Sequence, residues 1–136
     1  MTAIREQLLA AILTATGGAY GLPSPEDERD LPVTLVQDGT DSATNSYDTT
    51  SLTMPLNVAR AELAVGTDTD VLRAQAHAAL AKLIEDMHAD ETFGGLADGV
   101  DYTGGGIQIE VGKFVFAEAT FSLRYHHLRG QPSVLE

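Results

Sequence analysis

Cysteine and tryptophan are both absent from the 136-residue sequence, and only 6% of its residues are aromatic. Without cysteine, the chain has no disulfide framework, no thiolate zinc site and no cysteine nucleophile, and a reducing intracellular environment is the simplest expectation. The low aromatic content predicts a core built mainly from aliphatic side chains and alanine. No apolar run approaches the ~20 residues of a membrane span, and the N-terminus lacks a signal-peptide pattern, so we expect no membrane contact.

Basic residues are also scarce, with 8 Lys and Arg against 20 Asp and Glu, for a net charge of -12. The imbalance is regional: residues 26–110 contain 17 acidic and 4 basic residues, whereas residues 111–136 contain 2 acidic and 3 basic residues. An acidic chain repels phosphate backbones, so we expect no sequence-specific nucleic-acid binding. The uneven charge serves solubility, or it reflects acidic and mildly basic faces that meet between neighbouring copies.

The four histidines do not have the spacing of a metal site. His77 and His88 fall on a predicted helix, roughly 16 Å apart along its axis, so they cannot share one ion. His126 and His127 are adjacent on a predicted strand and therefore point to opposite faces. Surface positions are the simpler interpretation of all four side chains.

The acidic residues do not form a recognisable catalytic or calcium-binding motif either. Asp38, Asp41 and Asp48 lack the spacing, the glycine and the terminal glutamate of an EF-hand loop. We therefore expect no cofactor, no metal site and no enzymatic activity. The alternative is a small ligand-binding or hydrolytic α+β domain that uses Asp98, Asp101 or the histidines.

Alternating apolar residues predict an antiparallel hairpin near the C-terminus. From Val115 to Tyr125, every odd position is apolar and every even position except Phe116 is polar or charged, which is typical of a half-buried strand. Residues 107–111 alternate in the same way, and Gly112-Lys113 lies between the two runs, where a tight turn is expected. The glycine triplet at residues 104–106 predicts a bulge or bend in the first strand.

Two helices are predicted by apolar residues that recur every three or four positions. The first covers residues 2–15 and is followed by the stop signal Gly17-Gly18. The second runs from the N-cap candidates at residues 67–70 to about Ala89.

Two further strands are predicted, at residues 31–37 and 52–63. Within the second strand the apolar phase slips, which predicts a bulge near residues 58–60. Pro55 lacks an N–H group, so it should lie on a sheet edge or at an irregularity.

The segment at residues 38–51 is dominated by Asp, Gly, Thr, Ser and Asn. It is too polar to bury, and we predict a mobile hairpin tip between two strands. One hypothesis is that it becomes ordered on a protein partner, with Asp38, Asp41, Tyr47 and Asp48 as docking residues and Tyr47 as the anchor. A passive loop is the competing interpretation.

Taken in order, the elements are helix, strand, strand, helix, strand, strand. This order predicts an α+β fold in which two helices pack on a mainly antiparallel four-stranded sheet. A chain of 136 residues suits one domain, so we assign residues 1–136 to a single unit.

Three segments carry a resemblance to a known family. They are Leu31-Pro32-Val33-Thr34-Leu35, Leu56-Asn57-Val58-Ala59-Arg60-Ala61-Glu62-Leu63 and Ala119-Thr120-Phe121-Ser122-Leu123-Arg124-Tyr125. With the order of elements and the ending Arg129-Gly130-Gln131-Pro132, they resemble the tail terminator family of long-tailed bacteriophages, minor tail proteins that cap the finished tail tube.

The resemblance implies a virion protein, assembled in the host cytoplasm, that forms a homo-oligomeric ring, usually of six copies. Such a ring stops polymerisation of the major tail tube protein, meets a head-completion protein on its other face and lets DNA pass through its hole. A head-to-tail ring needs two different complementary patches on each copy. We expect Arg124 and Arg129 to face carboxylates of the next copy. A head-tail connector or another tail-completion protein is the closest alternative.

Overall fold

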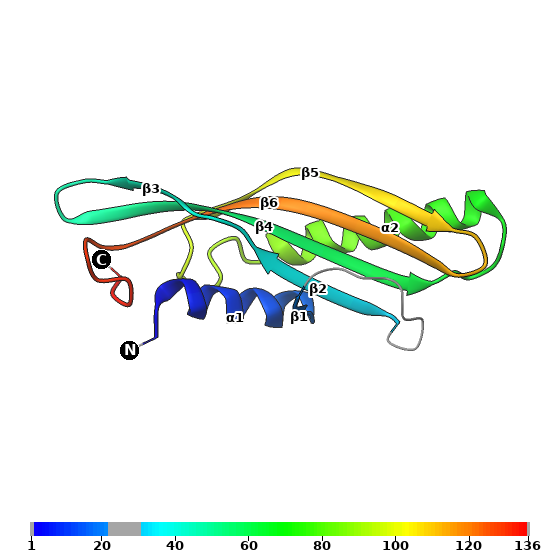
Figure 1. Cartoon of the computed structure of the whole chain (residues 1–136), viewed down its shortest axis with the longest axis horizontal. Helices are drawn as coiled ribbons and strands as arrows, with labels where there is room; N and C mark the ends of the chain where they lie inside the picture. The colour runs from blue at the N-terminus through cyan, green and yellow to red at the C-terminus, as the bar shows by residue number, and fades with distance from the viewer. Residues whose placement is uncertain (1, 22–30, 136) are drawn as a thin grey trace.

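The computed structural model describes residues 2–21 and 31–135. Within them, two helices and six strands form a long, shallow molecule (Figure 1). The elements are α1 (Ile4–Thr16), β1 (Ala19–Tyr20), β2 (Val33–Asp38), β3 (Ser42–Asn45), β4 (Thr49–Leu63), α2 (Thr69–His88), β5 (Gly99–Glu110) and β6 (Phe114–Leu128).

The sheet has six strands in the described residues, in the order β1-β2-β4-β6-β5, with β3 also paired to β4. All pairs are antiparallel except β1 with β2. The α+β class with two helices is confirmed, but the prediction of four strands was wrong. The two missed strands carry almost no periodic signal, because β1 has only two residues and β3 is the sequence Ser-Ala-Thr-Asn.

The central strand β4 pairs with β6 without interruption from Thr49 to Leu63, so the predicted bulge at residues 58–60 was wrong. Val58 and Ala59 are both buried although they point to opposite faces. Ala59 is paired with Leu35 on β2 and with Glu118 on β6, so it has a larger residue on each side. The phase slip therefore reflects a strand flanked on both sides, not an extra residue.

Two other irregularities were predicted correctly. The pairing of β5 with β6 shifts register between Tyr102 and Gly104, at the start of the glycine triplet. Pro55 lies opposite the gap between β2 and β3, where the N–H of Gly39 donates to the Pro55 carbonyl over 2.8 Å. The strands β2 and β3 thus follow one another along the same side of β4.

The helix boundaries follow the predicted capping signals. Gly17 adopts the left-handed conformation after α1, with φ 66°, and the N–H of Gly18 returns to the carbonyl of Leu13 over 3.0 Å. Asp68 caps α2 by accepting a hydrogen bond from the N–H of Asp70. Neither described helix is long and apolar enough to cross a membrane.

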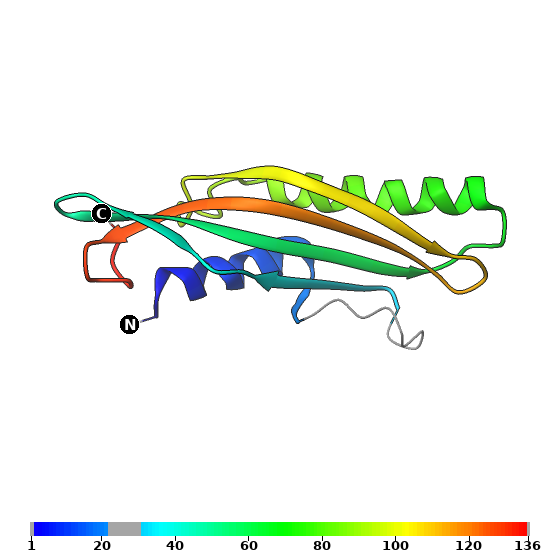
Figure 2. The same cartoon turned by 45° about the horizontal axis from the view of Figure 1, so that its top comes forward.

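Both helices pack on the same face of the sheet, with α1 beside β2 and α2 beside β5 and β6 (Figure 2). The core between them is aliphatic, with Leu8 and Ile12 from α1, Leu83 and Met87 from α2, and Phe121 at the centre of β6, all at most 1% exposed. This agrees with the low aromatic content. Among the described residues, no helix covers the opposite face of the sheet.

Replacing Gly105 with alanine is expected to destabilise the fold by about 1–3 kcal/mol, because the site is already filled. An added Cβ would lie 2.5 Å from the Tyr102 hydroxyl, 2.7 Å from the Glu118 carbonyl and 3.1 Å from Leu80. Gly106→Ala is the matched control, since no atom lies within 4 Å of its added Cβ. Urea unfolding of both variants checks the prediction, and equal midpoints would contradict it.

Candidate functional site

One end of the sheet extends beyond the helices as a hairpin arm, defined here as residues 42–53 (Figure 1). Its two strands are β3 and the start of β4, and the last residues of β6 pair along the other side of β4. All four side chains of β3 are exposed. The segment at residues 38–51, predicted as a loop, therefore contains a strand and forms part of a three-stranded extension.

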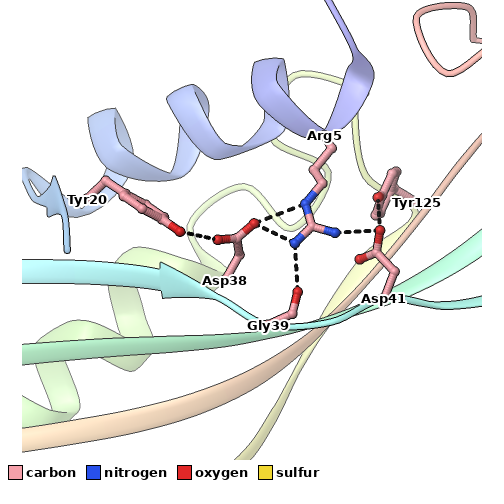
Figure 3. Close-up of polar contacts among 6 residues, drawn as sticks. All are labelled: Arg5, Tyr20, Asp38, Gly39, Asp41 and Tyr125. Carbon is pink, nitrogen blue, oxygen red and sulfur yellow. Dashed lines mark hydrogen bonds and ion pairs between the residues drawn. The ribbon is translucent and has the colours of Figure 1, made fainter. Parts of the chain in front are cut away.

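The root of the arm, residues 38–41, is held by an ion-pair network around Arg5 of α1 (Figure 3). The guanidinium donates to both carboxylates that flank the gap between β2 and β3: its Nε lies 3.0 Å from Asp38 Oδ2, and its Nη1 lies 2.6 Å from Asp41 Oδ2. Nη2 also donates to the Gly39 carbonyl over 2.6 Å. One planar cation thus joins α1 to both ends of the gap.

Two tyrosines complete this network from different elements. The hydroxyl of Tyr20, in β1, donates to Asp38 over 2.7 Å, and the hydroxyl of Tyr125, in β6, donates to Asp41 over 2.8 Å. Asp38 and Asp41 were predicted as docking residues. In the structure, both carboxylates have partners within the chain, on α1 and on the sheet, and their role in docking stays a prediction.

The network shifts the pKa values of its members. Partial burial opposes the charge of Asp38, but hydrogen bonds from Tyr20 and Arg5 outweigh it, so the pKa of Asp38 lies below its ordinary value. Burial, and then the hydrogen bond to Asp41, raise the pKa of Tyr125. The pKa of Arg5 is raised because its two carboxylate partners outweigh the effect of burial. The charged forms of Arg5 and Asp38 are therefore favoured by folding.

The lowered pKa of Asp38 predicts a pH-dependent contribution to stability. Ionised Asp38 stabilises the fold above its unfolded pKa of about 3.9, and this contribution is lost as the pH falls through the lower folded value. We expect the urea midpoint of Asp38→Asn to lie well below that of the wild type at pH 7 and to approach it below pH 4. Thr44→Ala, which removes no titrating group, should differ from the wild type equally at both pH values. An Asp38→Asn difference that is the same at pH 7 and pH 3 would contradict the prediction.

The tip of the arm is the turn at residues 46–49. It carries Tyr47, which is 94% exposed and is the most exposed large apolar side chain among the described residues. The turn itself is well formed, because the N–H of Ser46 donates to the Thr49 carbonyl over 2.8 Å. Asp48, the other residue predicted to dock, accepts a hydrogen bond from the N–H of Arg129 through its backbone carbonyl. Tyr47 is therefore presented by a defined turn.

The two predicted interface arginines have partners within the chain. The Arg129 guanidinium donates to the Ser46 carbonyl over 3.3 Å, which brings a positive charge to the tip of the arm. Arg124 lies on the uncovered face of the sheet, 3.6 Å from Asp101, and both side chains are more than half exposed. Their role between copies stays a prediction.

The acidic and histidine residues of the alternative hydrolytic interpretation are spread over the surface. His126 Nδ1 lies 2.9 Å from Asp98, and His88 Nδ1 lies 3.2 Å from Glu91. The His127 ring contacts the Leu128 carbonyl. Across residues 2–21 and 31–135, no group of three or more His, Cys, Asp or Glu side chains is arranged to hold a metal ion.

A groove runs between the two helices, on the side of the molecule away from the uncovered sheet face. Near the C-terminal end of α2 it measures about 390 Å³, and the apolar part of its lining, called the floor below, is formed by Ala11, Ala15, Ala89 and Phe93. Thr14, Asp86 and Asp90 complete the lining, and the two acidic residues are called the rim; Asp86 is ion-paired with Lys82. Helical periodicity indicates only that both helices face the sheet, and it does not reveal that a groove lies between them.

Sequence reasoning missed Arg5, Tyr20 and Tyr125 as members of the arm's root. Arg5 and Asp38 are 33 residues apart, and Tyr125 and Asp41 are 84 residues apart. The one available signal was that Arg5 is the only basic residue of the helix, next to the acidic Glu6. Charged residues on a helix are usually solvent-exposed, so this signal is weak.

No protein-family model and no curated protein matches the sequence. Among solved structures, the chain matches one described as the virion of a native gene transfer agent (GTA) particle. The alignment covers 91% of this chain and 92% of that chain, with 13% sequence identity and a TM-score of 0.40.

Proposed function

We propose that this protein is a structural component of a phage-type virion and that it acts as a tail terminator. In this role, copies of the chain form a ring on the last ring of tail tube protein, stop its polymerisation and offer the opposite face to a head-completion protein. The proposal includes no enzymatic activity and no cofactor.

The observation that carries this proposal is the location of the family-like segments. Residues 31–35 enter β2, residues 56–63 form the second half of β4, and residues 119–125 form the middle of β6. These three strands are neighbours at the centre of the sheet. The residues that resemble the family therefore form one contiguous part of the fold, around which the two helices pack.

The overall form of the chain also supports assembly into a ring. A head-to-tail ring requires two different patches per copy, and a projecting element on one copy can fill a recess on the next. The hairpin arm and the groove between the helices are such a pair of features.

The experiment that tests the proposal is the solution mass by light scattering on a sizing column, over a range of concentrations, with negative-stain images of the same fractions. We expect ring-shaped particles near six times the chain mass of 14.4 kDa, about 86 kDa. If free rings are absent, the protein is then added to growing tail tubes. We expect it to shorten the tubes and to form an extra ring at one end.

Two outcomes would contradict the proposal. A dimer at every concentration that leaves tube length unchanged would indicate a self-complementary patch. Binding to a portal or head protein without any effect on tube growth would favour the head-tail connector alternative.

A further inference from the structure

Tyr47 is exposed at the end of an ordered structure, which is unusual for an aromatic side chain that has no role in assembly. A tyrosine removes about 150–250 Å² from water when it is buried, and such side chains are enriched at protein interfaces. Here the ring is 94% exposed, and the turn that carries it is fixed by the hydrogen bond from Ser46 to Thr49. The ring is therefore held out at the tip, almost fully exposed among the residues that the structure describes.

The groove between α1 and α2 has the chemistry that a tyrosine requires. Its floor is apolar, with alanines at three of the four floor positions and Phe93 at the fourth. The rim carboxylate of Asp86 is ion-paired with Lys82, and that of Asp90 accepts hydrogen bonds from Thr92 and from the N–H of Gly94. An ionised carboxylate has about four acceptor positions, so both can accept a further hydrogen bond. A phenol ring fits such a groove with its apolar body on the floor and its hydroxyl at the rim.

The guanidinium of Arg129 gives the tip a cation that the groove can attract. It is tied to the Ser46 carbonyl, so the tip presents a cation and the phenol hydroxyl of Tyr47 together, next to the carboxylate of Asp48. The guanidinium and the phenol are both hydrogen-bond donors. At the rim of the groove, two carboxylates outnumber the ammonium group of Lys82, so the rim carries a net negative charge.

The tip cannot enter the groove of its own chain. The arm extends away from both helices, and β6 pairs with it as far as Thr49 opposite Leu128 (Figure 1). Filling the groove from within would require this ladder to be broken. An arm that enters this groove must therefore belong to another copy.

We propose that the tip of the arm of one copy docks in the groove between α1 and α2 of the next, with Tyr47 on the apolar floor and Arg129 against the rim carboxylates. This contact is head-to-tail, because the two surfaces are different, and it can be repeated around a ring. The inference rests on the proposed ring and identifies the contact that builds it.

Thiol-specific cross-linking tests this contact directly, since the natural sequence contains no cysteine. Two single variants, Asp48→Cys and Ala15→Cys, are mixed at a concentration where the wild type forms rings and treated with a short bismaleimide. Asp48 is exposed beside Tyr47, so this change puts a thiol at the tip and keeps the tyrosine ring. We expect a cross-linked dimer that contains one chain of each variant. The Asp48→Cys and Ala15→Cys double variant should give a ladder up to the size of the ring, whereas a twofold contact would stop at dimers.

The matched control is Val111→Cys, which places an exposed thiol in the turn at the opposite end of the sheet. Mixed with Asp48→Cys, it should give at least tenfold less cross-linked product. Equal yields with Ala15→Cys and Val111→Cys would overturn the inference. So would a ladder that requires a protein from the host extract.

A second measurement uses variants that leave the fold intact. Tyr47→Ala is expected to lower the fraction of protein in rings at least tenfold, and Tyr47→Phe should retain most of it. Thr44→Ala, another exposed residue of the arm, should form rings like the wild type. Rings that form equally well with Tyr47→Ala would overturn this contact and leave the proposed function standing. A wild type that forms no ring, free or on tubes, would remove the proposed function itself.

Discussion

Replacing Arg5 with alanine is expected to lower the free energy of unfolding by about 2 kcal/mol. The change leaves two carboxylates, Asp38 and Asp41, facing each other without their shared cation, and both side chains are less than 20% exposed. Loss of one partner from a fully buried pair costs about 3–5 kcal/mol. Because Arg5 itself is 31% exposed, solvent screens part of this effect and the lower figure is expected.

Urea unfolding of the Arg5→Ala variant measures this cost against two controls. Arg73→Ala removes an exposed ion pair with Asp70 and should change the free energy of unfolding by less than about 0.5 kcal/mol. Arg5→Met combined with Asp38→Asn and Asp41→Asn removes the stranded charges and should recover part of the loss. If Arg5→Ala and Arg73→Ala unfold at the same urea concentration as the wild type, the network does not stabilise the fold.

Replacing Phe121 with alanine should have a larger effect, about 4 kcal/mol. Phe121 is 1% exposed at the centre of β6 and lies opposite Leu56 on β4. Its ring is tilted against that of Tyr102, with 5.7 Å between the ring centres, and against His88 at 6.2 Å. Alanine removes all of these contacts and leaves a cavity between the sheet and both helices.

The Phe121→Ala prediction is checked by chemical unfolding, with two further variants for comparison. Phe121→Leu retains most of the volume and should cost about 1 kcal/mol, so it reports on the site even if the alanine variant does not fold. Phe116→Ala removes a half-buried ring from the uncovered face and should cost clearly less than Phe121→Ala. Equal losses at Phe116 and Phe121 would mean that the core does not lie on the helix-covered face.

Most of the regular structure could be predicted from the sequence, because it follows from local periodicity. The alternation from Val115 to Tyr125 correctly predicted β6, and Gly17 and Asp68 predicted the end of α1 and the start of α2. The strand β3 could not be predicted in this way. Its four residues are all exposed, so no apolar face distinguishes it from a loop.

The candidate site was predicted less completely, because its contacts join residues that are distant in sequence. The polar composition of residues 38–51 indicated Asp38 and Asp41 as candidate residues. It did not indicate Arg5, which binds both carboxylates. Tyr47 was selected as an anchor, and the structure leaves it exposed at the tip. The groove that we propose as its binding site depends on how far two helices diverge, and a single sequence does not encode that distance in any local pattern.

The gap between β2 and β3 also divides the sheet into two parts, the arm and the body, that can unfold separately. Beyond Gly39 the arm has no core of its own, so its strands are held by backbone hydrogen bonds and by the contacts at its root. Local opening of such a segment requires far less free energy than global unfolding. Amide hydrogens in β3 should therefore exchange with solvent much faster than those in the middle of β4 and β6. An arm that opens and closes without disturbing the core can enter a neighbour's groove after the body of the protein has folded.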